Sequence, residues 1–250
     1  MLTKTRDGIC PHQNQLLAAL SAVERERIFP HLQLVPMPFG KIVSEPGIAA
    51  RYAYFPTDCI VSFLYVMKDG ASTEIAVVGN DGMVGLALFT GAERSPSRAV
   101  VQSAGSAYRL VGERLKDELH LDGEMQSLLL RYTQTVLMQI AQTAACNRRH
   151  TLDQQLCRSL LAYLDRLPSN QLKMTQELLS NVLGVRREGV NSAAAKLQSL
   201  GAIRYSRGQI TVIDRSKLER ECCECYAVVK RETDRLLVQK RRKPQLHAGA

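Results

Sequence analysis

The sequence lacks any apolar run long enough to span a membrane, and its first ten residues lack the apolar core of a signal peptide. We therefore expect a cytoplasmic protein with no membrane partner. The chain holds 7 cysteines among its 250 residues. Because disulfides are rare in a reducing compartment, we expect these cysteines to be reduced and either buried or chemically active.

Familiar catalytic motifs are missing as well. The chain has no glycine-rich phosphate loop, no nucleophile elbow and no His-Glu-x-x-His pair. Its histidines are scattered without metal-ligand spacing, at His12, His31, His120, His150 and His247. The sequence therefore does not predict an enzyme.

Positive charge is concentrated in the last hundred residues. Residues 1–150 hold 15 Lys and Arg against 14 Asp and Glu, a net charge of +1, whereas residues 151–250 hold 18 against 10, a net charge of +8. A polyanion such as nucleic acid would be attracted to this C-terminal part.

The most informative stretch, residues 172–200, predicts two short helices joined by a tight turn. The hydroxyl of Thr175 can cap the first helix, and Gly184 can close it in a left-handed conformation. Apolar residues recur at helical spacing in both helices: Leu178, Leu179, Val182 and Leu183, then Val190, Ala194, Leu197 and Leu200. This pattern predicts a helix-turn-helix, whose second helix commonly enters the major groove of DNA.

An ordinary helical hairpin would show a similar pattern, but two features favour DNA binding. Basic and polar residues dominate the outer surface of the second helix, at Arg186, Arg187, Asn191 and Lys196. Residues 202–213 then alternate apolar and polar side chains around Arg207-Gly208, which predicts a β-hairpin. A helix-turn-helix followed by a hairpin is a winged helix.

At these residues the chain resembles the Crp/Fnr family of bacterial transcription regulators. The family typically carries an Arg-Glu pair before a valine in the second helix, and Arg187-Glu188-Gly189-Val190 matches this pattern. A second arginine often follows two residues after the valine, where this chain has Ser192. The half-site sequence that the best-known members read is therefore not assumed for this chain.

The resemblance implies a sequence-specific regulator that binds a twofold-symmetric operator as a homodimer, with double-stranded DNA and RNA polymerase as partners. Arginine can pair with guanine and a carboxylate can accept from cytosine, so we expect Arg187 and Glu188 to read bases. The full predicted DNA-binding set is Thr175, Arg186, Arg187, Glu188, Asn191, Ser192, Lys196, Arg204 and Arg207. The alternative is an interaction scaffold that keeps the winged helix without binding DNA.

The N-terminal half predicts two short helices, over residues 12–20 and 21–28, followed by strands. Ser21 and Glu24 are spaced as a capping box for the second helix. Candidate strands, separated by turn residues, are Tyr52–Phe55, Ile60–Met67, Thr73–Val78, Met83–Phe89, Arg98–Gln102 and Tyr108–Val111. Such strands predict a barrel, sandwich or jelly roll, and the resemblance selects a β-roll of the cyclic-nucleotide-binding type within an α+β fold.

Residues 124–147 predict a long helix with two apolar stripes. One stripe holds Leu129, Tyr132, Val136, Ile140 and Thr143, and the other holds Leu130, Leu137, Ala141 and Ala144. One stripe can pack on the β-roll and the other on a partner, although a single wide face packed within one subunit is the alternative. Since family members pair through this helix, we expect a parallel homodimer with Val136 or Ile140 near its axis.

We expect four regions: a β-roll sensor domain (1–123), a dimerisation helix with a hinge (124–150), a winged helix (151–220) and a C-terminal helix with a basic tail (221–250). Thr151 and Gln154 are spaced as a capping box for a helix that reaches Leu167. Asp214 can cap a last helix that runs to about residue 239, before the basic Lys240–Lys243.

The sensor half carries one element of a cyclic-nucleotide site. Family members that bind these ligands hold the phosphate with an Arg-Ser pair, which Arg94-Ser95 matches, and the ribose with a glutamate after a glycine. Here Gly85 is followed by Leu86-Ala87, so the carboxylate is missing. We therefore do not expect a cyclic nucleotide as cofactor, and the sequence does not identify the signal that controls the N-terminal domain.

The cysteines offer a second sensing chemistry. Cys222, Cys223 and Cys225 fall within one turn of the predicted last helix, and Cys222 and Cys225 would point the same way at i, i+3. Such a pair could bind zinc or an iron–sulfur centre, or oxidise reversibly. Only two thiolates would face one ion, however, and cysteine is also a common small core residue.

Overall fold

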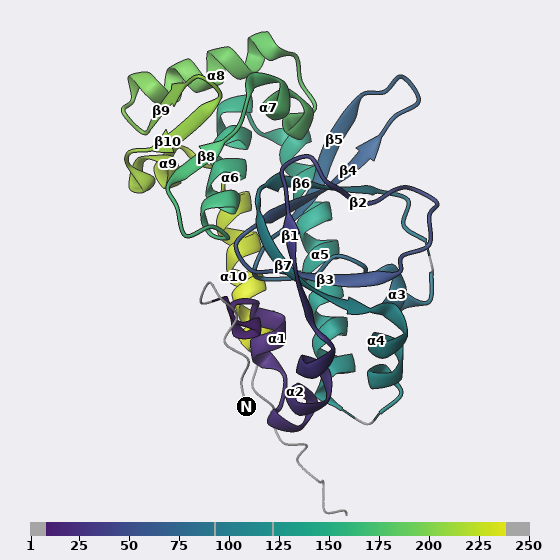
Figure 1. The fold of residues 1–250 in the computed structure, drawn as a ribbon. Helices are drawn as coiled ribbons and strands as arrows, with labels where there is room; N and C mark the ends of the chain where they lie inside the picture. Colours follow the sequence, from purple (N-terminus) through teal and green to yellow (C-terminus); the bar gives the residue numbers. More distant parts are fainter. Residues whose placement is uncertain (1–8, 93, 122, 239–250) are drawn as a thin grey trace, which may run out of the picture.

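The protein folds into a β-rich N-terminal half and a helical C-terminal half, with one long helix running alongside the β-rich half (Figure 1). A computed structural model describes residues 9–92, 94–121 and 123–238. No helix over these residues combines the length and apolar character that a membrane span requires. The expected α+β fold is confirmed.

Short helices precede the β-roll: η1 (Pro11–Gln13), α1 (Gln15–Ala19), α2 (Ala22–Ile28) and η2 (Phe29–His31). The capping box of α2 forms as predicted, because Ser21 Oγ accepts from Glu24 N while the Glu24 carboxylate accepts from Ser21 N. The same carboxylate also accepts from Met125 N at 2.8 Å. Glu24 therefore fixes the start of the long helix against α2.

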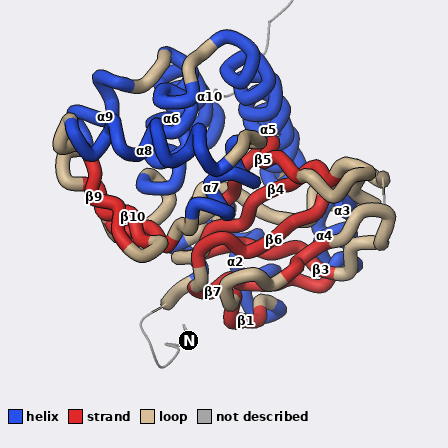
Figure 2. The backbone as a smooth tube through the Cα atoms, turned by 90° about the horizontal axis from the view of Figure 1, so that it is seen from above, coloured by secondary structure: helices blue, strands red, loops and turns tan. Residues whose placement is uncertain are grey.

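The β-roll consists of two antiparallel sheets, visible as the red layer in Figure 2. One sheet has the order β1-β7-β3, from β1 (Gln33–Met37), β7 (Gly105–Val111) and β3 (Tyr52–Pro56). The other has the order β2-β6-β4-β5, from β2 (Ile42–Ser44), β6 (Arg98–Ser103), β4 (Ile60–Val66) and β5 (Ser72–Val78). Buried apolar side chains fill the space between them, including Met37, Val61, Val101 and Ala107.

Two features of the β-roll differ from the predicted strands. The strand expected at Met83–Phe89 is reduced to a single bridge between Val84 and Tyr54, and α3 (Ala87–Thr90) follows. Gly85 ends the extended backbone there, because its φ is +112°. The sequence pattern also missed β1 and β2, which are sheet-edge strands, and β1 carries Pro36, a residue that edge strands tolerate but the middle of a central strand does not.

The long helix α5 (Glu124–Arg149) follows α4 (Gly112–Leu119) and buries one of its two stripes within the subunit. Leu129, Tyr132 and Val136 are buried against the β-roll and the N-terminal helices. Val136, expected near a dimer axis together with Ile140, is buried in the subunit's own core, and Ile140 is partly buried against that core, so neither side chain lies on the exposed stripe. The other stripe, with Leu130 and Leu137, is exposed.

The C-terminal half begins with α6 (Leu152–Leu164), whose capping box from Thr151 and Gln154 forms as predicted, although the helix ends three residues before Leu167. It continues with β8 (Gln171–Lys173), α7 (Gln176–Leu183), α8 (Arg187–Ser199), β9 (Ile203–Ser206) and β10 (Gln209–Val212). The small sheet has the order β8-β10-β9. The sequence predicted the β9–β10 hairpin but missed β8, a strand of three residues.

The expected last helix is divided into α9 (Arg215–Glu221) and α10 (Glu224–Val238). Asp214 caps α9 as predicted, with Oδ1 accepting from Lys217 N at 3.0 Å. The helix stops at Cys222, whose ψ of 153° is extended. After this break α10 turns back along α5 and reaches α1 (Figure 1). The basic Lys240–Lys243 lie outside the described residues.

Candidate nucleic-acid interface

Helices α7 and α8 form the predicted helix-turn-helix. Thr175 Oγ1 accepts from Leu178 N at 3.1 Å and caps α7. Gly184 closes α7 with a φ of +65°, and α8 begins after Arg186. Leu179 and Val190 are fully buried between the helices and their core, as expected. Leu200 was expected to point inward but is 40% exposed, because α8 ends there.

The outer face of α8 is polar and open to solvent. Its exposed residues include all those predicted on the second helix: Arg186, Arg187, Glu188, Asn191, Ser192 and Lys196. Figure 1 shows α8 along the outer edge of the C-terminal half. A helix exposed in this way can enter the major groove of DNA, which is about 12 Å wide.

Two basic side chains of α8 are held by carboxylates of neighbouring helices. Arg187 Nη2 lies 3.0 Å from Glu177 Oε2 of α7, and Lys196 Nζ lies 2.5 Å from Asp153 Oδ2 of α6. The hydrogen bond to Asp153 raises the pKa of Lys196. Exposed pairs of this kind are weak, so both cations can exchange their carboxylates for DNA. The sequence did not reveal these partners, because they come from other helices.

The wing, formed by β9 and β10, adds two exposed arginines next to the helix-turn-helix. Arg204 lies on β9, and Arg207 lies in the turn, where it and Gly208 have φ values of +51° and +74°. Two positive φ values suit the tight turn of a two-residue hairpin. A Cβ atom at Gly208 would lie 3.2 Å from Thr175 Cγ2, so the tip of the wing lies against the start of α7.

The helix-turn-helix is also docked on the β-roll. A Cβ atom at Gly184 would lie 2.7 Å from Thr73 Oγ1 of β5. Nearby, Tyr163 OH of α6 donates to Glu74 Oε2 at 2.7 Å, and Ser62 Oγ donates to the same oxygen. Burial raises the pKa of Glu74, because it disfavours the charged carboxylate.

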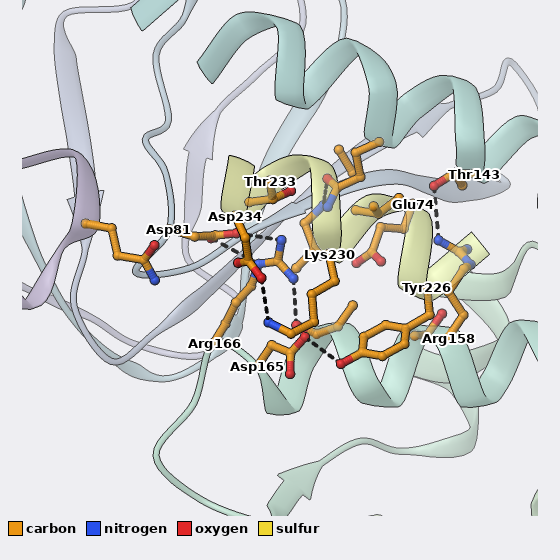
Figure 3. Close-up of a pocket in the computed structure, with 17 residues that line it drawn as sticks. Glu74, Asp81, Thr143, Arg158, Asp165, Arg166, Tyr226, Lys230, Thr233 and Asp234 are labelled. Atoms are coloured by element: carbon orange, nitrogen blue, oxygen red, sulfur yellow. Dashed lines mark hydrogen bonds and ion pairs between the residues drawn. The ribbon is translucent and has the colours of Figure 1, made fainter. Parts of the chain in front are cut away.

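A cavity of about 80 Å³ lies beside these contacts (Figure 3). Its wall includes Arg166, which makes a two-pronged ion pair with Asp81 of the β-roll, at 2.6 and 3.0 Å. Tyr226 OH donates to Asp165 at 2.9 Å, and Lys230 pairs with Asp234 at 3.3 Å. Of these three contacts, the ion pair of Arg166 with Asp81 joins the C-terminal half to the β-roll, whereas the other two lie within the C-terminal half.

The residues predicted for a possible effector are not gathered into one site. Arg94 is exposed, and its backbone bridges Ala49. Ser95 Oγ lies 3.0 Å from Ser97 Oγ, and Gly85 packs close to the carbonyl of Tyr52. Gly85, Arg94 and Ser95 do not line the cavity beside Arg166.

The cysteines of the C-terminal region meet residues from the end of α5. The ligand atoms of Cys146, His150, Cys223 and Cys225 all lie within 4.8 Å of one another, and Cys222 is outside this group. We call these four residues the cysteine–histidine group. The pairing of Cys222 with Cys225 was inferred for one continuous helix, which the break at Cys222 rules out. The Cys-x-x-x-His spacing of Cys146 and His150 was the signal that we missed.

Comparison with known proteins bears on the C-terminal domain and on the fold. Residues 154–221 match the family described as the Crp-like helix-turn-helix domain. No curated protein matches the sequence. Among solved structures, a protein from Eubacterium rectale assigned to the Crp/Fnr family of transcriptional regulators is similar, with 17% identity, 82% of this chain and 96% of that chain covered, and a TM-score of 0.65.

Two further structures show the same fold. FixK2 from Bradyrhizobium japonicum has 16% identity, covers 77% of this chain and 98% of its own, and gives a TM-score of 0.64. TTHB099, a transcriptional regulator of the CRP family from Thermus thermophilus, has 18% identity. It covers 75% of this chain and 95% of its own, and gives a TM-score of 0.63. The resemblance is thus confirmed: the chain carries a Crp-like helix-turn-helix domain and has the fold of the Crp/Fnr transcriptional regulators.

Proposed function

We propose that the protein is a transcriptional regulator that binds a twofold-symmetric operator as a homodimer, with α8 in the major groove. The observation that carries this proposal is the polar, solvent-exposed face of α8, which adjoins a wing with two exposed arginines. The match of residues 154–221 to a Crp-like helix-turn-helix domain supports it. A catalytic role has no comparable support.

In this proposal the exposed side chains divide into two kinds of contact. Arg187 and Glu188 lie in the first turn of α8, the part of a recognition helix that reaches base edges. Arg186, Lys196, Arg204 and Arg207 bind phosphates, which position the protein without reading sequence. Arg187 leaves Glu177 when it binds DNA.

The exposed stripe of α5 supports pairing with a second copy of the chain. Leu130 and Leu137 are 56% and 57% exposed, which is unusual for leucines on a helix whose other side is buried. Exposed residues recur at alternating spacings of three and four, at Ser127, Leu130, Gln134, Leu137, Ala141 and Ala144. This spacing is typical of a coiled-coil seam, and the alanines allow close approach. A parallel pair would place two α8 helices on one face of a duplex.

We further propose that the controlling signal is not a cyclic nucleotide. Arg94 is exposed and no carboxylate follows Gly85, so a ribose hydroxyl would find no acceptor there. Calorimetry with cyclic AMP should show weak binding or none, whereas micromolar affinity would contradict this point. RNA polymerase is a further partner in this proposal.

A gel-shift of the full chain with random duplex tests the proposal. We expect binding at low salt that weakens steeply as salt is added, because phosphate contacts release counterions. Absence of binding at low salt would instead favour an interaction scaffold.

A further inference from the structure

We propose that Cys146, His150, Cys223 and Cys225 form a binding site for a single zinc ion. The residues come from two places far apart in sequence: the end of α5 and the start of α10. The inference goes beyond the proposed DNA-binding function and does not rest on it, since metal uptake is measured without DNA.

The spacing of the ligand atoms suits one tetrahedral ion. With Zn–S bonds of about 2.3 Å and Zn–N bonds of about 2.0 Å, neighbouring ligand atoms lie about 3.5–3.8 Å apart. Cys146 Sγ lies 3.6 Å from Cys223 Sγ, and Cys225 Sγ lies 3.5 Å from His150 Nδ1. The widest separation in the group is within 4.8 Å. A cluster of several irons places its ligands on different metal atoms and needs wider spacing.

The histidine is oriented as a metal ligand would be. Its Nδ1 faces the sulfurs, while its Nε2 lies 3.2 Å from Glu224 Oε2. A carboxylate that accepts from the far nitrogen fixes the tautomer and orientation of a ligating histidine. The backbone of His150 is held on both sides, by its N–H to Cys146 O at 3.0 Å and by Gln155 Nε2 to its carbonyl at 2.9 Å.

The surroundings of the site exclude water. Cys146, Cys223 and Cys225 are 0%, 6% and 1% exposed, so the site is closed, as structural zinc sites are. Gln142 Nε2 donates to Cys225 Sγ at 3.0 Å. Zinc binds cysteine as a thiolate, so the three thiols would release their protons when the ion binds.

The site would connect the end of the long helix α5 to the start of the last helix, α10. Cys146 and His150 lie where α5 passes into α6, and Cys223 and Cys225 flank the first residue of α10. A bound ion would hold α10 on α5 and explain why the last helix breaks at Cys222.

Zinc uptake by the reduced full chain, measured by titration against a chromophoric chelator, tests the proposal. We expect one zinc ion per chain, and a cobalt(II) derivative with the intense absorption of a tetrahedral thiolate site. Cys223→Ser and His150→Gln should lose stoichiometric uptake, and Glu224→Gln should weaken it by roughly 10-fold. The matched controls are Cys222→Ser, next to the site, and Cys10→Ser, an exposed cysteine; both should bind as the wild type does.

Two results would overturn the proposal. The reduced wild type could bind less than one ion per chain, or Cys223→Ser, folded by circular dichroism, could bind as tightly as the wild type. If the first result came with a Cys146–Cys223 disulfide in the chain as purified, it would assign the pair to redox chemistry. The cobalt spectrum of the wild type needs no variant, so it tests the proposal even if a substitution unfolds the protein.

Discussion

Arg187 and Arg207 are both exposed and basic, but their positions give them different tasks on DNA. Arg187 is the first residue of α8, while Arg207 lies in the turn of the wing. Arg187→Ala should cost about 1–3 kcal/mol on the operator and relax the preference at one base pair of each half-site. Arg207→Ala should weaken binding to all sequences alike. It should also reduce the slope of log affinity against log salt concentration by roughly one per subunit. Binding curves on specific and random duplexes at several salt concentrations distinguish the two.

The ion pair between Arg187 and Glu177 provides a control for this experiment. Glu177→Gln removes the competing carboxylate and keeps Arg187, so operator binding should stay the same or become slightly tighter. If Arg187→Ala lowers the affinity for specific and random duplexes equally, Arg187 is a phosphate contact and our orientation of α8 is wrong.

Glu74 links the stability of the protein to pH. Burial raises its pKa by more than the hydrogen bonds from Ser62 and Tyr163 lower it. Because the folded carboxyl holds its proton more tightly than the unfolded one, its stabilising effect is complete below the unfolded pKa. That effect is lost as the pH rises through the folded pKa.

Glu74→Gln removes this titration and keeps an oxygen that can accept both hydrogen bonds. We expect the free energy of unfolding of the variant to fall less than that of the wild type as the pH rises from about 4.5 to neutrality. Urea unfolding at a series of pH values measures this difference. Parallel pH profiles for the two proteins would show that Glu74 titrates normally.

At the scale of single elements, the exposed stripe of α5 makes a direct prediction about assembly. Leu137→Glu places a charge at the centre of the proposed seam without touching the subunit core, so it should convert the dimer to a monomer. Val23→Glu, at a residue of α2 that is 61% exposed, is the matched control and should leave the dimer intact. Light scattering reports the mass, and an unchanged mass for Leu137→Glu would rule out pairing through this stripe.

The elements that the sequence predicted well are those fixed by local interactions. Ser21 with Glu24, Thr151 with Gln154, and Asp214 each bond to backbone groups within three residues, so spacing alone reveals them. The helix-turn-helix and its wing were also predictable from local signals, because Gly184 and Arg207-Gly208 mark their turns.

The elements that the sequence missed depend on distant partners. The short β8 exists because it pairs with β10, about forty residues later in the chain. The break at Cys222 accompanies contacts of Cys223 with Cys146, 77 residues away. The DNA-facing residues could be named in advance, but the carboxylates of Glu177 and Asp153 and the cysteine–histidine group required the tertiary structure.

At the scale of the whole molecule, the buried ion pair of Asp81 and Arg166 fixes the C-terminal half on the β-roll. The two side chains are only 15% and 9% exposed, so removing one leaves the other charged and unpaired. Arg166→Ala should therefore destabilise the protein by about 3–5 kcal/mol. Arg114→Ala, which removes an exposed pair with Asp117 at 3.9 Å, should change stability little. Chemical denaturation measures both, and equal effects would contradict the assigned role.

The central claim is that two copies of the chain read DNA together through α8. Selection of binding sequences from a random duplex pool, with the full chain, tests it most directly. We predict an enriched twofold-symmetric sequence with half-site centres about 10 base pairs apart or a multiple of this, bound by two chains. The same selection with Arg187→Ala should keep the symmetry and relax one position in each half-site. Enrichment of no sequence, or of an asymmetric site bound by a single chain, would contradict this claim.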